Sequence, residues 1–155
     1  METRNDARST ASANDNQGSD LSTLNVLVAD DNLYMRRAIR VMLEELQVRC
    51  VYEVNNGADA LQSLSASWYD IMLVDCRMGP IDGIDLTRAI RRANNPSYAK
   101  IPIVMISGAL SPELVADARD AGVQAFLVKP VLTPLLRKCL TAVLAQPDQF
   151  VHMRG

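Results

Sequence analysis

The chain has 155 residues, the length of one ordinary domain with room for a buried core. Its 48% apolar and 22% charged residues are typical of a globular protein, and a formal net charge of −2 gives no reason to expect binding to nucleic acid or to a membrane surface. No apolar run approaches the roughly 18 residues that a membrane-spanning helix needs, we expect no signal peptide, and three widely spaced cysteines indicate reduced thiols in a cytoplasmic protein.

The distribution of apolar residues divides the chain into three regions. Residues 1–23 are polar, contain few aliphatic side chains and show no periodicity, so we expect a disordered N-terminal tail. Residues 24–146 carry the periodic segments and are predicted to form one domain. Residues 147–155 are predicted to be a short C-terminal tail.

After the first tail, short apolar runs alternate with segments of helical period. The run NVLVAD at 25–30 predicts a buried strand, and NLYMRRAIRVMLEELQ at 32–47 predicts an amphipathic helix with its charged residues outward. RCVYEV at 49–54 and DIMLVD at 70–75 predict two further strands, separated by a short helix over 58–67.

The second half of the chain continues the same alternation. Asp82 is placed to cap a helix over 83–93, and IPIVMIS at 101–107 predicts a strand. Ser111, followed by a proline, begins the next helix, which ends at Gly122. A last strand and helix follow, the strand at 124–128 and the helix beginning with Thr133 as cap and Pro134 in its first turn.

Five strands that alternate with five helices predict an α/β fold with a doubly wound parallel sheet. The strands at 25–30, 70–75 and 101–106 are continuous apolar runs, as interior strands of a parallel sheet are. Right-handed crossovers then place helices on both faces. Ligands of such sheets bind at the carboxyl ends of the strands, so these ends are where a site is expected.

The strand ends carry a specific set of polar residues. The first strand ends in Asp30 and Asp31, the third in Asp75, the fourth in Ser107 and the fifth in Lys129. Each residue alone has an ordinary explanation as a helix cap, a loop acid or part of a turn. Together they bring three carboxylates, a hydroxyl and an ammonium group to one edge of the sheet, which favours a functional site.

The chemistry of such a site follows from its charges. Three close carboxylates repel one another, and a hard divalent cation such as Mg²⁺ relieves the repulsion while it also binds water and phosphate oxygens. Ser107 and Lys129 are suited to hold the oxygens of a phosphoryl group. A carboxylate can itself be the nucleophile that accepts this group, and Asp75 is the central candidate.

These residues resemble the pattern of a known family. The segment ADDNLYMRRAIRVMLEEL and the strand-end residues resemble the receiver domain of bacterial response regulators, in particular a chemotaxis-like, stand-alone receiver. The resemblance covers residues 24–146. It implies a flavodoxin-like (βα)5 fold with five parallel strands in the order 2-1-3-4-5.

The resemblance also implies a metal site and a phosphoacceptor. Asp30 and Asp31 match the acidic pair that holds Mg²⁺ (or Mn²⁺) in the family. Asp75 matches the phosphoacceptor, whose carboxylate also contacts the metal. Arg77 matches the position whose backbone carbonyl completes the metal shell.

Three further residues match positions that respond to phosphorylation in the family. Ser107 matches the hydroxyl switch residue, and Phe126 matches the aromatic switch residue, here without a hydroxyl group. Lys129 matches the lysine that binds the phosphoryl group, and the resemblance implies a cis peptide bond between it and Pro130.

The implied function is phosphoryl transfer to Asp75 from a sensor histidine kinase or a histidine phosphotransfer protein. Phosphorylation is then expected to change the face formed by the helix from Ser111, the strand 124–128 and the last helix, where an unidentified protein target binds. The protein is thus expected to be a signalling switch that supports its own phosphorylation and dephosphorylation, rather than an enzyme. Two alternatives remain open, a phosphorylation-independent interaction module and a phosphate sink in a phosphorelay. Because only about ten residues follow the last predicted helix, we expect no DNA-binding domain.

The loop DCRMGPIDG after the third strand departs from the family pattern D-x-x-M-P-G-x-D-G, because Gly79 and Pro80 stand in reversed order. Proline biases the residue before it away from the helical region, and glycine also permits positive φ. We therefore expect the loop that directs the Arg77 carbonyl to run differently here. The Arg77 side chain is expected either to tune the lifetime of the phosphoryl group or to be an ordinary solvated arginine.

Overall fold

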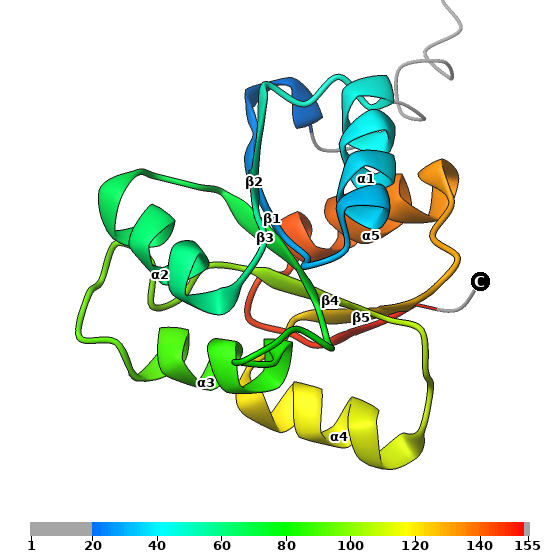
Figure 1. Ribbon diagram of the computed structural model, residues 1–155. Helices are drawn as coiled ribbons and strands as arrows, with labels where there is room; N and C mark the ends of the chain where they lie inside the picture. Colours follow the sequence, from blue (N-terminus) through cyan, green and yellow to red (C-terminus); the bar gives the residue numbers. More distant parts are fainter. Residues whose placement is uncertain (1–19, 154–155) are drawn as a thin grey trace, which may run out of the picture.

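The computed structural model describes residues 20–153, and Figure 1 shows a central sheet with helices on both of its faces. The strands are β1 (Asn25–Ala29), β2 (Cys50–Val54), β3 (Ile71–Asp75), β4 (Ile103–Ser107), β5 (Ala125–Val128) and β6 (Val151–His152). The helices are the short 3-10 helix η2 (Leu21–Thr23), α1 (Leu33–Glu45), α2 (Gly57–Ala66), α3 (Gly83–Arg92), α4 (Pro112–Ala121) and α5 (Thr133–Ala145). Within this part of the chain, no helix is both long and apolar enough to cross a membrane.

All strands run parallel in one sheet, in the order β2-β1-β3-β4-β5-β6. The first five strands have the predicted order 2-1-3-4-5, so the doubly wound, flavodoxin-like fold is confirmed. The strand order changes direction between β1 and β3, and the crevice at the carboxyl ends of these two strands is where such sheets bind ligands. A ligand site is therefore expected at the carboxyl ends of β1 and β3.

Both ends of the described chain are more ordered than predicted. β6 lies within the segment 147–155 that the sequence predicted to be a tail, and it pairs with β5. A strand of two residues is too short to show a period in the sequence. At the other end, η2 lies inside the predicted N-terminal tail, and its Leu21 is buried. Residues 1–19 of that tail lie outside the described residues.

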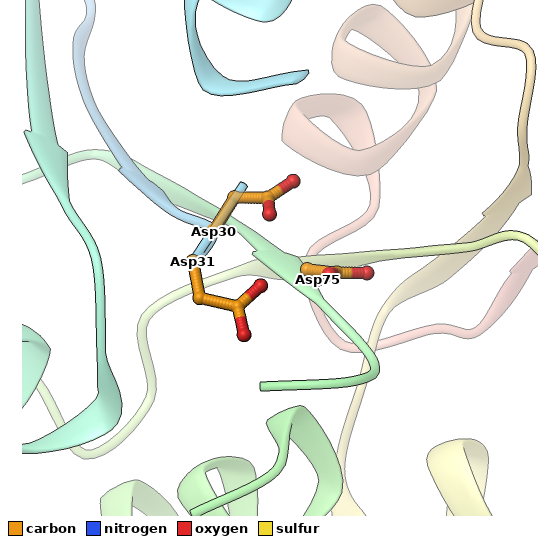
Figure 2. A group of neighbouring side chains, drawn as sticks. All are labelled: Asp30, Asp31 and Asp75. Carbon is orange, nitrogen blue, oxygen red and sulfur yellow. The ribbon is translucent and has the colours of Figure 1, made fainter. Parts of the chain in front are cut away.

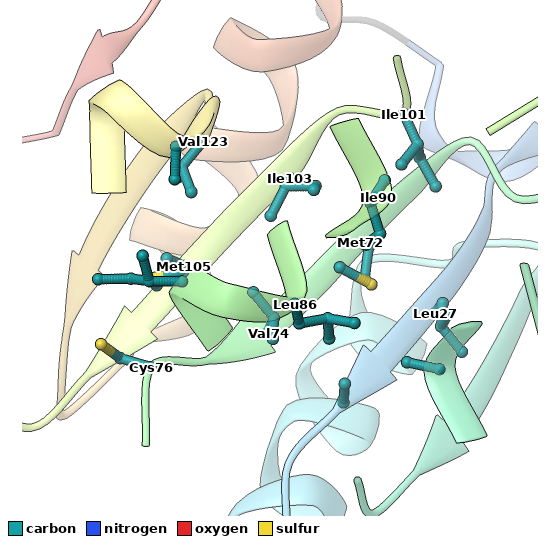
Figure 3. Packing of buried hydrophobic residues seen from close by; sticks show 14 of the residues in the cluster. Leu27, Met72, Val74, Cys76, Leu86, Ile90, Ile101, Ile103, Met105 and Val123 are labelled. Atoms are coloured by element: carbon teal, nitrogen blue, oxygen red, sulfur yellow. The ribbon is translucent and has the colours of Figure 1, made fainter. Parts of the chain in front are cut away.

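The sheet separates two apolar cores. Alternate side chains of β1 point to opposite faces, so that Val26 and Val28 pack towards α1 and α5, whereas Leu27 packs towards α2 and α3. Burial of one large apolar side chain contributes about 1.5–3 kcal/mol to folding. On the second face, Figure 3 shows how the sheet strands and α3 share one core; its labelled residues include Met72, Val74, Leu86, Ile90, Ile103 and Met105.

Side-chain caps begin most of the helices. The caps of α1, α3 and α4 each accept a hydrogen bond from the backbone N–H three residues later; they are Asn32, Asp82 and Ser111. The predicted cap at Thr133 is wrong, because α5 already includes this residue and its N-cap, Leu132, makes no side-chain hydrogen bond. The Thr133 hydroxyl instead donates to Oε2 of Glu45 on α1, at 3.0 Å.

Arg91 connects α3 to the end of α4. Its guanidinium group donates to the carbonyl oxygens of Gly122 and Ala99, at 2.8 Å and 2.9 Å, and to Oε1 of Gln124 at 3.0 Å. Burial lowers the pKa of Arg91 to about 10, which still leaves the group charged at neutral pH. Gly122 ends α4 in the left-handed conformation, with φ at 109°.

Candidate functional site

Three carboxylates meet at the carboxyl edge of the sheet (Figure 2). Asp30 and Asp31 follow β1 directly, and Asp75 is the last residue of β3, the strand beside it. One oxygen of each carboxylate lies within 4.8 Å of those of the other two. The structure therefore brings together the three acids that the sequence placed at neighbouring strand ends.

Asp30 is the most buried of the three, with 1% of its surface exposed. Its Oδ1 accepts a hydrogen bond from the backbone N–H of Asn32 at 2.8 Å, whereas its Oδ2 is buried without a hydrogen-bond partner. Burial raises the pKa of Asp30 to about 6, and the negative charge of Asp75 adds to this effect. Asp30 does not cap α1, since Asn32 occupies that position.

Arg36 supports the Asp30 backbone, a contact that the sequence did not predict. Its guanidinium Nη1 donates to the backbone carbonyl of Asp30 at 2.8 Å. Its Nε lies 3.3 Å from Oε1 of Glu53 on β2, an ion pair without hydrogen-bond geometry. The sequence placed Arg36 among the arginines of the outer face of α1, and nothing in the helical pattern distinguishes it from its neighbours.

Lys129 brings a positive charge to Asp75. Its Nζ lies 3.3 Å from Oδ1 of Asp75, and both side chains are shielded from solvent, being 24% and 8% exposed. The backbone N–H of Lys129 also donates to the carbonyl of Ser107 at 2.7 Å, so the residue is tied to the end of β4. The peptide bond between Lys129 and Pro130 is cis, as the resemblance implied.

Ser107 lies at the end of β4, next to β3 in the sheet, and is 1% exposed. Its hydroxyl oxygen accepts a hydrogen bond from the backbone N–H of Ala109 at 3.1 Å. Phe126 lies away from the three carboxylates, in the middle of β5, where its side chain is buried in the same core as Met105. The structure thus places Ser107 at the carboxyl edge and Phe126 within the neighbouring core.

The loop between β3 and α3 is closed against the end of β3. The N–H of Gly83 donates to the carbonyl of Cys76 at 2.9 Å. A Cβ at Gly83 would collide with the backbone carbonyl of Asp75, so only glycine allows this approach. The sequence did not single out Gly83 for this role, although an Asp-Gly pair at the start of a helix is a signal for a close turn.

The reversed pair in this loop also forms a cis peptide bond, between Gly79 and Pro80. Among residues 20–153 the only glycine with positive φ is Gly122, so Gly79 does not use the left-handed conformation that the sequence left open. The side chain of Arg77 is exposed at the surface. The role of its backbone carbonyl as a metal ligand stays a prediction.

The donor set of the acidic cluster fits a hard divalent cation. Mg²⁺ binds through one or two carboxylates together with waters and phosphate oxygens. Three carboxylates from two strand ends provide such oxygens. The buried Oδ2 of Asp30, which lacks a hydrogen-bond partner, is the kind of atom that a cation would complete.

Comparison with known proteins gives consistent matches. The family model of the response regulator receiver domain matches residues 26–141. The chain is 30% identical over 115 residues to the chemotaxis protein CheY of Pseudomonas aeruginosa, a match that covers 74% of this chain and 91% of that protein.

A second relative is much longer than this chain. The chain is 35% identical over 135 residues to the cyclic di-GMP phosphodiesterase response regulator RpfG of Xanthomonas campestris; the match covers 85% of this chain but only 35% of that protein. Among solved structures, the receiver domain of the sensor histidine kinase PA1611 of Pseudomonas aeruginosa, with a magnesium ion coordinated in the active site cleft, is 27% identical with a TM-score of 0.72. That match covers 80% of this chain and 99% of the other.

Proposed function

Because the chain belongs to the response regulator receiver domain family, we propose that it is a phosphoacceptor switch and that Asp75 receives the phosphoryl group. The observation that carries the proposal is the contact of Lys129 with Asp75 beside two further acids. The proposed donor is a phosphohistidine of a sensor histidine kinase or of a histidine phosphotransfer protein. Reduced cysteines at positions 50, 76 and 139 support a cytoplasmic location.

In the proposed reaction, a carboxylate oxygen of Asp75 attacks the phosphorus of the phosphohistidine in line with the N–P bond. The P–O bond forms as the N–P bond breaks, and the electron pair of the broken bond leaves with the imidazole nitrogen. Asp75 reacts as a carboxylate, so no proton has to be removed from it. Later attack of water on the acyl phosphate restores the carboxylate and releases inorganic phosphate.

The residues of this chain contribute mainly charge and position. Lys129, already 3.3 Å from Asp75, is placed to bind an oxygen of the phosphoryl group as this group moves onto Asp75. Asp30, Asp31 and Asp75 would hold Mg²⁺ or Mn²⁺, with the Arg77 carbonyl as a further proposed ligand. A divalent cation in this place supplies neutralisation of the phosphoryl charge.

The proposed response begins at Ser107. To bind a phosphoryl oxygen, its hydroxyl donates its own hydrogen, and rotation of the side chain towards the phosphoryl group would break the hydrogen bond that it accepts from the Ala109 N–H. Ser107 pairs with Val128 across β4 and β5, so its rearrangement acts directly on the strand that carries Phe126. Because Phe126 has no hydroxyl, the response of this side chain depends on packing alone. The proposed output is a shift between two packings of the α4-β5-α5 face, where a target protein binds.

Labelling with a small phosphodonor tests the proposal. The protein is incubated with acetyl phosphate and Mg²⁺, and intact mass spectrometry measures the added phosphoryl group, which hydroxylamine should remove from an acyl phosphate. We expect Asp75→Asn to abolish labelling and Asp117→Asn, at an exposed position on α4, to preserve it. Labelling that persists in Asp75→Asn would reject Asp75 as the acceptor. A wild-type chain that binds no Mg²⁺ and takes no label would favour a phosphorylation-independent interaction module.

A further inference from the structure

The outer edge of β5 is covered by the chain's own C-terminal segment, residues 149–153. β6 runs parallel to β5 in this segment, with Val151 opposite Ala125 and His152 opposite Phe126. The N–H of Val151 donates to the carbonyl of Gln124 at 2.6 Å. Figure 1 shows the red C-terminal strand beside β5 at the outer edge of the sheet. Without this segment, β5 would be an edge strand with open backbone groups.

Alternate side chains of the C-terminal segment fall on opposite faces of the sheet. Phe150 packs against the core on the side of α4, whereas Val151 and Met153 pack against the core on the side of α5. These three residues line one side of a pocket of about 520 Å³ around the β5 edge. Its other walls come from β5 itself, through Phe126, and from both neighbouring helices and their loops; the latter include Leu110, Val115, Pro130, Leu132 and Leu135.

The C-terminal segment has the shortest strand pairing in the sheet. The pairing covers two residues, and the side chains of Phe150, Val151 and Met153 are only half-buried. In contrast, every residue of β3 and β4 is buried. Residues 146–149, which lead from α5 towards β6, are all exposed. Segments with few buried contacts and exposed connections open at the lowest free-energy cost, so this strand is the one most easily released.

The strand that β6 covers is also the strand that contacts the proposed phosphoacceptor. Lys129, immediately after β5, forms the ion pair with Asp75, and its N–H is bonded to the Ser107 carbonyl. Phe126, three residues before Lys129, pairs with β4 on one side and with β6 on the other. No other element lies between β5 and β6, so a change at the carboxyl end of β5 can act on β6 directly.

We propose that the edge of β5 is a strand-addition site for a partner protein, that residues 149–153 keep it closed, and that phosphorylation of Asp75 weakens this closure. The last part rests on the proposed function, whereas the strand-addition site itself does not. The partner is an extended apolar segment, because this is the chemistry of the segment that now occupies the site. It would place an aromatic side chain towards α4 and aliphatic side chains towards α5, with backbone hydrogen bonds to β5.

Two exposed leucines at the rim of the pocket support a partner larger than the chain's own segment. Leu110, before α4, and Leu132, before α5, are 66% and 64% exposed. Large apolar side chains that flank a groove from two sides extend the contact surface beyond what β6 covers. Both leucines lie beyond the carboxyl ends of strands, Leu110 after β4 and Leu132 after β5, and line the same pocket as the C-terminal segment.

A peptide added in trans tests the site without phosphorylation. The fluorescent peptide PDQFVHM, residues 147–153 of this chain with blocked ends, is titrated by anisotropy against the full chain and against Val151→Pro, which removes the N–H donated to Gln124. Val151→Thr keeps this N–H and the side-chain shape and serves as the control. Because the tethered segment competes at a millimolar effective concentration, we expect Val151→Pro to bind the peptide at least about tenfold more tightly than the other two proteins.

The result is specific if the peptide PDQSSHM, in which serines replace Phe150 and Val151, does not bind. Equal binding of PDQFVHM to all three proteins, or no binding to a folded Val151→Pro variant, would overturn the strand-addition site. If Val151→Pro fails to fold, the double variant Phe150→Ser, Val151→Ser takes its place, because it weakens the segment on both faces and leaves the backbone unchanged.

The link to phosphorylation is tested on the unaltered chain with Mg²⁺ and beryllofluoride as the phosphoryl analogue. We expect amide hydrogen exchange of residues 149–153 to accelerate at least about fivefold, and PDQFVHM to bind more tightly, when the analogue is present. If the analogue binds and neither property changes, the link is wrong although the proposed function stands. If the analogue does not bind at all, the proposed function fails and the link fails with it, while the result with Val151→Pro still decides on the strand-addition site.

Discussion

Nζ of Lys129 lies 3.3 Å from Oδ1 of Asp75, although 54 positions separate the two residues in the sequence. The contact joins the end of β5 to the end of β3 across β4. It places the positive charge beside Asp75, the one acid of the cluster that is itself the last residue of a strand. The charge of Lys129 should therefore matter more for the reaction at Asp75 than for the fold.

Lys129→Met should slow phosphorylation by acetyl phosphate about 10- to 100-fold, because a charge-assisted hydrogen bond of this kind contributes about 1.5–3 kcal/mol. Binding of Mg²⁺ should be retained or become tighter, since the variant removes a positive charge near the cation. Lys138→Met, at an exposed position on α5, is the matched control and should react at the wild-type rate. Equal rates for the two variants would contradict a role of Lys129 in the transfer.

The affinity for Mg²⁺ should depend on the protonation of Asp30, whose pKa burial raises to about 6. Above this pH the carboxylate is ionised and the affinity should be constant. Below it, a proton competes with the cation and the affinity should fall about tenfold for each pH unit. Calorimetric titrations from about pH 5 to about pH 8 measure this dependence. The plot of Mg²⁺ affinity against pH should keep its inflection in Asp31→Asn. A wild-type plot without this inflection would show that Asp30 does not bind the cation.

Without metal, Asp30→Asn should stabilise the folded protein at pH 8. Below its unfolded-state pKa of 3.8, the Asp30 carboxyl is protonated in both states and its ionisation does not destabilise the fold. Above its folded-state pKa of about 6, the buried carboxylate is ionised and lowers the free energy of unfolding by the full amount. The free energy of unfolding of Asp30→Asn should exceed that of the wild type by roughly 1–3 kcal/mol at pH 8 and equal it near pH 4. Urea unfolding with EDTA at both pH values measures it. The same gain at both values would assign it to a cause other than ionisation.

Gly83→Ala should destabilise the protein by about 1–3 kcal/mol and lower its phosphorylation rate, because the added Cβ collides with the Asp75 carbonyl. Gly79→Ala, in the same loop, is the control, since a Cβ at Gly79 meets no atom within 4 Å. Its effect on unfolding should stay below about 0.5 kcal/mol. Thermal unfolding and acetyl phosphate labelling of the two variants test whether stability and phosphorylation depend on the close approach at Gly83 or only on the composition of the loop.

Arg77→Ala should change the rate of dephosphorylation about two- to fivefold, as expected for an exposed cation that interacts with the acyl phosphate in solvent. The half-life of the phosphorylated protein after removal of the donor measures this rate. Arg137→Ala, exposed on α5, is the matched control. An unchanged half-life in Arg77→Ala would identify Arg77 as an ordinary solvated side chain.

The sequence was sufficient for the architecture because interior strands such as β3 and β4 are buried on both faces. The runs in β3 and β4 are continuous and apolar, and their ends coincide with Asp75 and Ser107, so order and topology alone brought the polar residues to one edge. In contrast, β6 is two residues long and leaves no pattern. The contact of Arg36 with the Asp30 carbonyl depends on a rotamer, and the need for glycine at position 83 depends on a backbone approach that only the folded chain creates.

The hydrogen bonds of Arg91 give α4 two unequal ends. At its C-terminal end, the Gly122 carbonyl is held by α3, and Gln124 beyond it is bound by the same guanidinium group. At its N-terminal end, the Ser111 side chain bonds only within the helix, to the N–H of Leu114, and the preceding Leu110 is exposed. A shift of α4 is therefore expected to be a swing about Gly122, with the largest displacement at the end that follows β4.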